Sequence, residues 1–376
     1  MFPQASADDH RVKIAGGGVA ALEAVLALRE LAGDRVEVEL LSPEPEFSLR
    51  ALSVARPFDA GESHRLDLSE FCREQGIGFR ADGLAEVWGE QQRLLTLSGE
   101  EVYYDALLIA FGARQHAVLP GATVFRGPSD VDAFSELLAD LERGALRHLA
   151  FVVPREVRWA LPLYELALMT ARQMRELAPA DVDLAFVTHE RGPLDVFGER
   201  ISGQIAELLR EAGITIHAGR AATRFEDDRL LFDDGSGLET HHVVTLPGLR
   251  VPAIPGVAQG RKGFIGTDSQ MRVDGLDAVW AAGDATWFPI KQGGIAAQQA
   301  EVAAGCIASA AGADVQPDPF RPLIRGALLT GDEARFIRVA PGEQEGGELS
   351  TSPLWWPPAK VAGRRLAPYL SRRWGG

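Results

Sequence analysis

The sequence has little cysteine and no long apolar run, and each shortage excludes a class of protein. Its 376 residues contain two cysteines, Cys72 and Cys306, too few for a disulfide framework or a cysteine-based metal site. No stretch approaches the ~18 uninterrupted apolar residues that a membrane-spanning helix needs. The only adjacent histidines, His241 and His242, would point to opposite faces of a strand. The sequence therefore predicts no metal site and no transmembrane helix.

Positive charge is also in short supply. The chain has 38 lysines and arginines against 53 aspartates and glutamates, and its formal net charge of −15 would repel nucleic-acid phosphates. The first ten residues, MFPQASADDH, lack the basic-then-apolar order of a signal peptide, so we expect a cytoplasmic protein. Composition and length are typical of a globular protein with two domains and an appendage.

A strand-turn-helix pattern occurs twice in the chain. KIAGGGVAALEA (13–24) has three glycines in its turn, whereas FVVPREVRWALPLYELA (151–167) keeps the same order without them. Three landmarks recur with the pattern, as the pairs Gly16 and Val153 (where each turn is expected to begin), Gly76 and Gly213, and Gly112 and Gly248. The members of these pairs lie 137, 137 and 136 residues apart. One spacing kept over about a hundred residues indicates a duplicated unit.

Each copy alternates strands and helices, with a hairpin before its last strand. The strands VEVELLS (36–42) and VDLAFVT (182–188) follow the two turns, and the hairpins fall in 84–110 and 222–246. Alternation of this kind favours a parallel sheet with right-handed crossovers. The sequence therefore predicts an α/β protein with two Rossmann-like, dinucleotide-binding domains in tandem.

The first turn has the residues that a bound pyrophosphate requires. Gly16 permits the tight turn, Gly18 lets a phosphate approach the backbone, and Ala21 fills the third, small-residue position at the start of a helix. The acid that should end the second strand and hold a ribose falls at Ser42. Glu44 is the alternative ribose ligand, unless it is a solvated loop carboxylate.

Two further segments resemble motifs of flavoproteins that bind two dinucleotides. LLIAFGAR (107–114), with Gly112, resembles the strand and Gly-Ala turn that close their first domain. VWAAGDATWFPIKQGG (279–294) resembles the motif that holds the ribityl chain of FAD, which assigns Gly283 and Asp284 to that cofactor. A helix predicted to start at Gly293 and Gly294 would direct its N-terminus at the flavin, with Lys291 assisting.

Over roughly residues 11–310 the chain resembles the pyridine nucleotide-disulfide oxidoreductase superfamily. Within it the chain resembles the sulfide:quinone oxidoreductase and type II NADH dehydrogenase branch, and PLYE (162–165) and FPIKQGG (288–294) are more similar to the sulfide:quinone side. The resemblance implies FAD, an acid-base candidate at Glu165 beside Lys291, and nested domains. The nested arrangement comprises an FAD domain at 1–122 and 258–320, an NAD(P)-binding-like domain at 123–257, and a C-terminal segment at 321–376.

The second turn has lost its glycines. The repeat aligns Val153, Arg155 and Arg158 with the small residues of the first turn, and Pro154 lacks the backbone N–H that could bind phosphate. A scaffold without nucleotide is the main interpretation. The alternatives are NAD(P)H held by the two arginines, which can bind a phosphate directly, and some other anionic ligand.

These features predict an FAD-dependent oxidoreductase that passes electrons to a quinone or protein acceptor. No closely spaced cysteine pair is present for disulfide chemistry. The alternatives are an NAD(P)H dehydrogenase and a non-catalytic, redox-responsive flavoprotein. Residues 354–376 hold five basic residues, three tryptophans and no acid, which suits peripheral contact with the inner face of a membrane. Docking on the protein's own acidic surface, or a homodimer contact, is the alternative for this segment.

Overall fold

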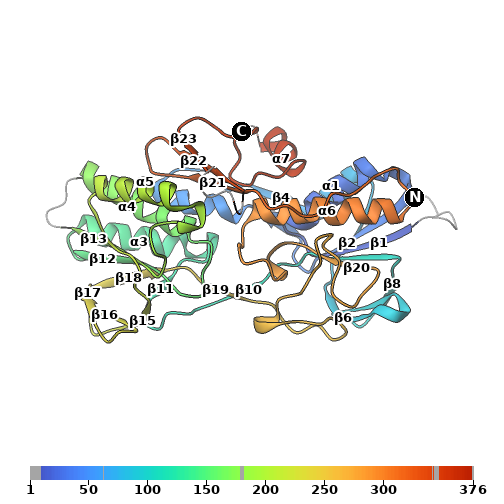
Figure 1. Ribbon diagram of the computed structural model, residues 1–376, viewed down its shortest axis with the longest axis horizontal. Helices are drawn as coiled ribbons and strands as arrows, with labels where there is room; N and C mark the ends of the chain where they lie inside the picture. Colours follow the sequence, from blue (N-terminus) through green and yellow to red (C-terminus); the bar gives the residue numbers. More distant parts are fainter. Residues whose placement is uncertain (1–9, 62, 178–181, 341, 343–346, 375–376) are drawn as a thin grey trace.

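The structure is a computed structural model, and it describes residues 10–61, 63–177, 182–340, 342 and 347–374. Most of the N-terminal segment from which a cytoplasmic protein is expected, residues 1–9, lies outside them. Two α/β units lie side by side, and the C-terminal segment crosses over both (Figure 1). The mixed α/β class with parallel sheets, predicted from the alternating pattern, is confirmed.

The first unit is built on a five-stranded parallel sheet. In spatial order its strands are β20 (Val279–Ala281), β9 (Ala106–Ile109), β1 (His10–Ala15), β2 (Val36–Leu41) and β5 (Gly78–Arg80). Its helices are α1 (Val19–Leu31), α2 (Leu68–Gln75) and α6 (Gly293–Ala310). Because β20 pairs with β9, the chain returns to this sheet after it has completed the second unit.

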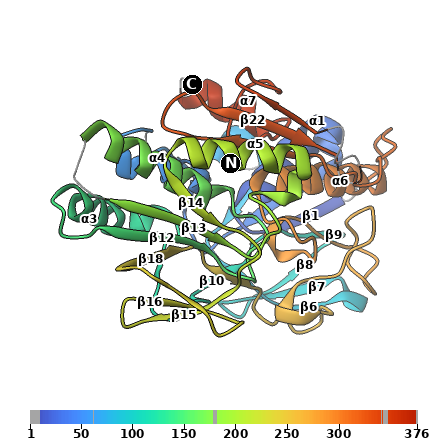
Figure 2. The ribbon, with the colours of Figure 1, turned by 60° about the vertical axis from the view of Figure 1, so that its left-hand side comes forward.

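The second unit repeats the arrangement. The strand order is β11 (Thr123–Val124), β18 (His242–Thr245), β12 (His148–Val153), β13 (Asp183–Thr188) and β14 (Ile214–His217). Its helices are α3 (Val131–Glu142), α4 (Leu161–Leu177) and α5 (Glu199–Glu211). Figure 2 shows α4 and α5 on one side of this sheet and a small antiparallel sheet on the other.

Short antiparallel sheets complete both units. The first unit has two of them: one formed by β6 (Leu84–Trp88), β7 (Arg93–Thr96) and β8 (Glu101–Tyr103), and one formed by β3 (Glu46–Ser48) and β4 (Arg65–Asp67). The second unit has one, formed by β15 (Ala222–Glu226), β16 (Arg229–Phe232) and β17 (Gly237–Glu239). The predicted hairpins are therefore confirmed. The two crossings between the units pair with each other, as β10 (Arg114–His116) and β19 (Gly248–Arg250).

The duplication is regular in the strands and irregular in what joins them. Three residues separate β1 from α1, but seven separate β12 from α4. Val153 is the last residue of β12 and pairs with Thr188, so the prediction that the second turn begins at Val153 is wrong by one residue. The turn begins at Pro154, because the parallel ladder satisfies the backbone of Val153.

The C-terminal segment packs on both units. Its hairpin, formed by β21 (Ile324–Leu328), β22 (Arg335–Val339) and β23 (Glu348–Ser350), shares a hydrophobic core with α4 and α5. Its last helix, α7 (Leu366–Trp374), lies against α1 and shares the core of the first unit.

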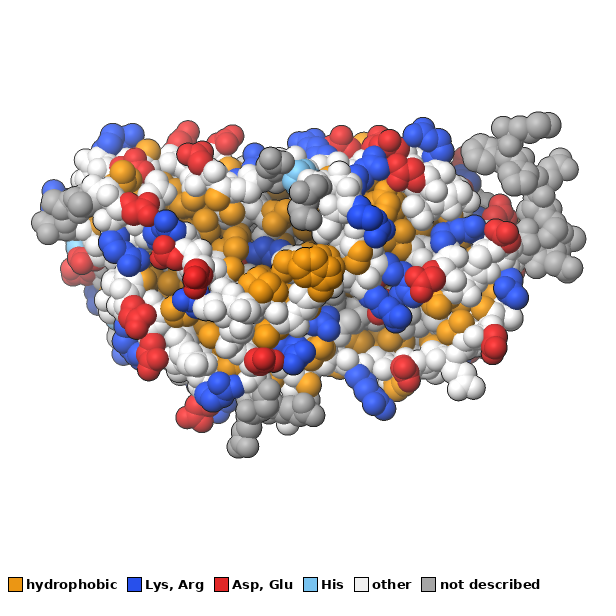
Figure 3. All heavy atoms as spheres, turned by 90° about the horizontal axis from the view of Figure 1, so that it is seen from above, with side chains coloured by type: hydrophobic (Ala, Val, Ile, Leu, Met, Phe, Trp, Pro, Cys, Tyr) orange, Lys and Arg blue, Asp and Glu red, His pale blue; other side chains and the backbone are white. Residues whose placement is uncertain are grey.

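Acidic side chains of the first unit bind the basic residues of α7 and the residue before it. Arg365 pairs with Glu30 and Glu301, and Arg373 pairs with Glu70 and Glu74. On the outer face of this segment, apolar side chains gather near the centre and charges of both signs are intermingled around them (Figure 3). In the described part of the chain, no helix has the length and apolar character to span a membrane.

Candidate functional site

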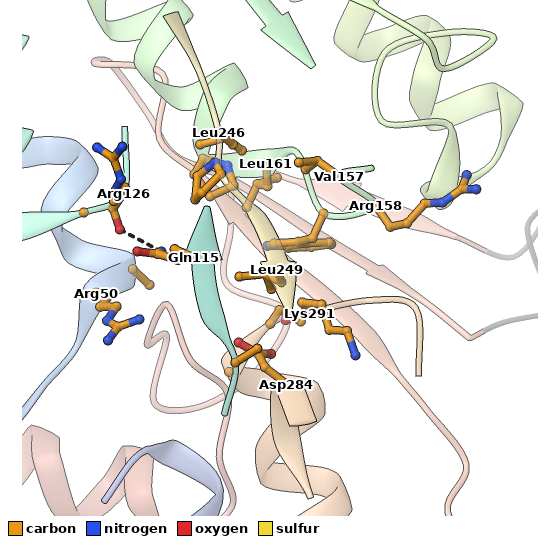
Figure 4. A pocket seen from close by; sticks show the side chains of 18 of the residues that line it. Arg50, Gln115, Arg126, Val157, Arg158, Leu161, Leu246, Leu249, Asp284 and Lys291 are labelled. Atoms are coloured by element: carbon orange, nitrogen blue, oxygen red, sulfur yellow. Dashed lines mark hydrogen bonds between the residues drawn. The ribbon is translucent and has the colours of Figure 1, made fainter. Parts of the chain in front are cut away.

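A cavity of about 850 Å³ lies where the two units and the C-terminal segment meet. The first unit contributes side chains that include Gln115 and Asp284, and the loop before α4 contributes residues 155–159. Figure 4 shows Asp284 and Lys291 on one side of this space and Val157 and Leu161 on another. The predicted residues Glu165 and Gly293 also line it, so four of the predicted site residues share one cavity.

The glycine turn after β1 lies outside this cavity and has its own geometry. Gly16 has φ +134°, and a Cβ there would lie 2.4 Å from the backbone carbonyl of Ala110. Gly18 has open space where its Cβ would be, with no described atom within 4 Å. No described side chain caps the N-terminus of α1, and its first turn holds no acid. The bare N–H groups and the helix dipole can therefore bind a pyrophosphate, which fits FAD.

The end of β2 places the two ribose candidates differently. Ser42 is buried, and its hydroxyl donates a 2.8 Å hydrogen bond to the backbone carbonyl of Glu44. A Cβ at Gly17 would lie 2.8 Å from the same hydroxyl, so the glycine turn packs directly on Ser42. Glu44 is exposed, which leaves its carboxylate available to a ligand. Ala21 is fully buried, so it serves packing of α1 on the sheet.

Gly283 and Asp284 follow β20, at the same end of the sheet as the glycine turn. Gly283 has φ +81° and donates its N–H to Gln299 of α6 at 2.8 Å. The carboxylate of Asp284 is half-buried and receives no hydrogen bond from the described residues. Burial raises its pKa, against the opposing charges of Lys291 and Arg50. A carboxylate with free acceptor positions beside a cavity can bind hydroxyl groups such as those of a ribityl chain.

Lys291 precedes α6 and is largely withdrawn from water. Its ammonium donates to the backbone carbonyl of Thr286 and lies 4.1 Å from the ring centre of Phe264. Burial lowers its pKa to about 8, although the carboxylate of Asp284 acts in the opposite direction. Lys291 can therefore exchange a proton near neutral pH.

The N-terminus of α6 is also uncapped among the described residues, and its first turn holds no acid. A Cβ at Gly293 would lie 2.7 Å from Val361, so a glycine is required for the C-terminal segment to approach. Gly294 is buried beside Gln292, whose side-chain nitrogen is buried without a hydrogen-bond partner in the described structure. Gly112 has φ +78° in the loop after β9, next to Ala113 at the cavity wall.

Sequence reasoning missed the partner of Glu165. Lys360, one of the five basic residues in 354–376, is buried and forms an ion pair with Glu165. The backbone N–H of Leu329 donates to the same carboxylate oxygen at 2.9 Å, while the other oxygen is buried without a partner among the described residues. Burial raises the pKa of Glu165 and lowers that of Lys360, and their mutual attraction opposes both shifts. No local pattern links residues 195 positions apart.

The second turn differs from a nucleotide-binding turn in the side chains it presents. Arg155 and Arg158 are both exposed at the cavity, and Arg155 forms an ion pair with Asp233. Glu190, which follows β13 as a ribose ligand would, is largely buried and accepts hydrogen bonds from Tyr164 at 2.6 Å and Thr188 at 2.7 Å. Both bonds go to Oε2, so one of the two carboxylate oxygens is already bound by side chains of the protein.

Neither cysteine lines the cavity. Both are buried and free, and burial raises the pKa of Cys72 to about 12 and that of Cys306 to about 11. A thiol is a nucleophile only as its thiolate, so both groups are inert at neutral pH.

Residues 165–305, from α4 into α6, match the family model described as "Pyridine nucleotide-disulphide oxidoreductase". Within these residues the chain is similar to pyridine nucleotide-disulphide oxidoreductases. The predicted resemblance is confirmed by this match, and with it FAD as the cofactor and the class of flavin oxidoreductase.

Solved structures agree with this match. The sulfide:quinone oxidoreductase of Aquifex aeolicus is similar with a TM-score of 0.82 and 20% identity, over 91% of this chain and 86% of that one. A ferredoxin reductase from Rhodopseudomonas palustris is similar with a TM-score of 0.66 and 21% identity, over 88% and 83% of the two chains. Putidaredoxin reductase, in its complex with putidaredoxin, is similar with a TM-score of 0.65 and 18% identity, over 89% of this chain and 82% of that one. These likenesses establish the fold.

Proposed function

We propose that this protein passes electrons through FAD to a quinone or a protein acceptor, from a donor that is not bound in an ordinary NAD(P)H site. The contrast between the two turns carries the proposal. The first turn leaves an uncapped helix N-terminus beside open space, whereas the second has seven residues, with Pro154 and two arginines, before its helix begins. The preoccupied carboxylate of Glu190 supports the same conclusion.

FAD supplies two-electron chemistry when it is bound, and the residues described above would orient it. The N-terminus of α1 would bind its pyrophosphate and Asp284 its ribityl hydroxyls. Lys291 would place a positive charge, or a transferable proton, beside the ring system. The paired Glu165 and Lys360 line the same cavity, which supports a role for Glu165 in moving a proton to or from the second substrate.

Two of the similar structures support the two kinds of acceptor in this proposal. One similar protein is named for quinone and another was solved with its protein partner. The C-terminal segment lies over the cavity, and Trp356 in it is 87% exposed. An exposed tryptophan on this face supports peripheral contact with a membrane surface, from which a quinone would enter.

Anaerobic titration of the purified, FAD-loaded protein with NADH and then NADPH tests the proposal. We expect neither nucleotide to bleach the flavin band, while dithionite bleaches it fully. A soluble quinone and a small redox protein should then reoxidise the reduced protein at different rates, which identifies the acceptor class. Rapid bleaching by a stoichiometric amount of nucleotide would instead make the protein an NAD(P)H dehydrogenase, with Arg155 and Arg158 as its phosphate ligands. A flavin that no quinone or protein reoxidises would indicate a non-catalytic flavoprotein.

A further inference from the structure

Positive charge is concentrated in the cavity of an otherwise acidic protein. Nine lysine and arginine side chains and three carboxylates line it, although the whole chain has a net charge of −15. A concave site with charge of one sign attracts ligands of the opposite sign. Some of these cations are already neutralised, since Lys360 pairs with Glu165 and Lys262 with Glu156. The unpaired ones therefore indicate what the site lacks.

Arg325 is the least satisfied of these cations. It lies on β21 and is half-buried at the cavity, and no described residue forms an ion pair or hydrogen bond with its guanidinium. Its Nε is fully buried without a partner. Burial and the nearby Arg338 lower its pKa, which expresses the cost of keeping this charge in place. A buried, unsatisfied charged group destabilises a fold unless a ligand satisfies it.

The register of the C-terminal hairpin makes this cost larger. Arg325 lies directly opposite Arg338 in the pairing of β21 with β22, and like charges in that position repel. Arg338 is exposed and has its own partner, because it donates to Glu348 at 2.9 Å. Arg325 has no such hydrogen-bonded partner among the described residues, and only the more distant charge of Glu301 opposes the repulsion. An acidic ligand in the cavity would supply such a partner.

The rest of the cavity suits an organic ligand. Apolar side chains from both units, including Val157, Leu161 and Leu249, line the space near the loop before α4 (Figure 4). The unpartnered side-chain nitrogen of Gln292 offers a further donor at the wall. Apolar walls with a few polar groups that fix orientation are typical of small-molecule sites.

We propose that the second substrate is an organic anion, with an apolar, ring-sized body between the two units and a carboxylate or phosphate group on Arg325. The planar guanidinium matches both oxyanions through paired hydrogen bonds. This inference rests on the proposed function, because the cavity adjoins the residues that would hold FAD. An acidic protein would meet the exposed Arg155 and Arg158, whereas Arg325 is half-buried.

Three probes of one size test the proposal on the FAD-loaded protein: benzoate, phenyl phosphate and the neutral benzamide. Binding is followed by calorimetry and by perturbation of the flavin spectrum, without turnover. We expect at least one of the anions to bind about tenfold or more tightly than benzamide. Arg325→Gln should remove this preference and Arg325→Lys should retain part of it. Arg338→Gln is the matched control, because it removes the opposing arginine of the same register pair. The anion preference should persist in it, slightly weakened by relief of the repulsion.

Two results would overturn the inference: equal affinity of the wild-type protein for all three probes, or an unchanged anion preference in Arg325→Gln. If Arg325→Gln does not retain FAD, Arg325→Lys is used in its place. If that variant binds all three probes with the same affinities as the wild-type protein, the proposal is contradicted. The two proposals fail separately. Electron transfer by the protein without FAD would contradict the proposed function. An FAD-loaded protein with no preference for anions would contradict only this inference.

Discussion

The turn after β1 and the turn after β12 leave equivalent strands and reach their helices in different ways. Three residues, all glycine, lead to α1, and the helix N-terminus stays bare. Seven residues lead to α4, and five of them, 155–159, line the cavity between the units instead. The sheets are alike because burial of their strands constrains them, while a turn is free to change once no phosphate lies on it. A duplicated unit can thus keep its sheet while the turn after its first strand becomes part of a cavity wall.

The carboxylates beside the two turns show the same contrast. Glu44 is exposed after β2, whereas Glu190 is turned inward after β13 and is bound by Tyr164 and Thr188. In the second unit the polar groups that a nucleotide would need satisfy one another. The first unit leaves such groups open, and the experiments below test this difference between the units.

The largest effect should come from the ion pair that anchors the second unit to the C-terminal segment. Lys360→Met leaves Glu165 buried without its cation, which should cost about 3–5 kcal/mol of unfolding free energy. The pKa of Glu165, already raised by burial, should rise further. The folded state would then hold a proton that the unfolded state releases, so the stability of the variant should fall as pH increases above the ordinary glutamate range. Denaturant unfolding at several pH values measures this. The control is the double variant with Glu165→Gln, which should recover part of the lost unfolding free energy. If Lys360→Met were as stable as the wild-type protein, the importance of the ion pair would be contradicted.

Gly16→Ala tests the first turn directly. The positive φ of Gly16 and the contact with Ala110 predict a loss of about 3 kcal/mol and little retained flavin. Pro154→Ala is the matched change in the second turn and should leave the flavin content unaltered. The ratio of flavin to protein absorbance, with a thermal melt, measures both. Equal flavin loss in the two variants would contradict the contrast between the turns.

Gly18→Asp should separate cofactor binding from folding. Its side chain has open space and would cap α1, so the apoprotein should gain a few tenths of a kcal/mol. The added carboxylate would repel the pyrophosphate and occupy its N–H donors, so FAD affinity should fall about 100-fold, or roughly 2.7 kcal/mol. Fluorescence titration of the apoprotein with FAD measures the affinity. Arg155→Asp in the second turn serves as the comparison, and an equal fall there would mean that both turns bind the cofactor.

Lys291→Met should produce the smallest change. A positive charge beside the flavin favours its reduced form, so its removal should lower the two-electron midpoint potential by about 20 mV, or ~1 kcal/mol. Because the pKa of Lys291 is lowered to about 8, the lysine is charged below that pH and neutral above it. The difference between wild type and variant should therefore be present at pH 7 and disappear above about pH 9. A constant difference across this range would place the titration elsewhere.

The strands, the hairpins and the first glycine turn could all be predicted from the sequence. Apolar runs, glycines and a repeated spacing are local signals, and the parallel sheets follow from the alternation of strands and helices. The two arginines of the second turn could be read in the same way, since Arg155 and Arg158 stand where glycine would be needed. The length of that turn could not, because the constant spacing of the landmarks hides residues gained in one connection and lost in another.

Sequence alone thus predicted two Rossmann-like units, one whose turn keeps its glycines and one whose turn does not. Only the tertiary structure decided that Glu165 meets Lys360, that Glu190 is bound internally, and that Arg325 lies unpaired at the cavity. The reason is physical. Strands and turns are set by neighbours in the chain, whereas the partner of a buried charge is set by how separate segments pack, and that packing joins residues 195 positions apart.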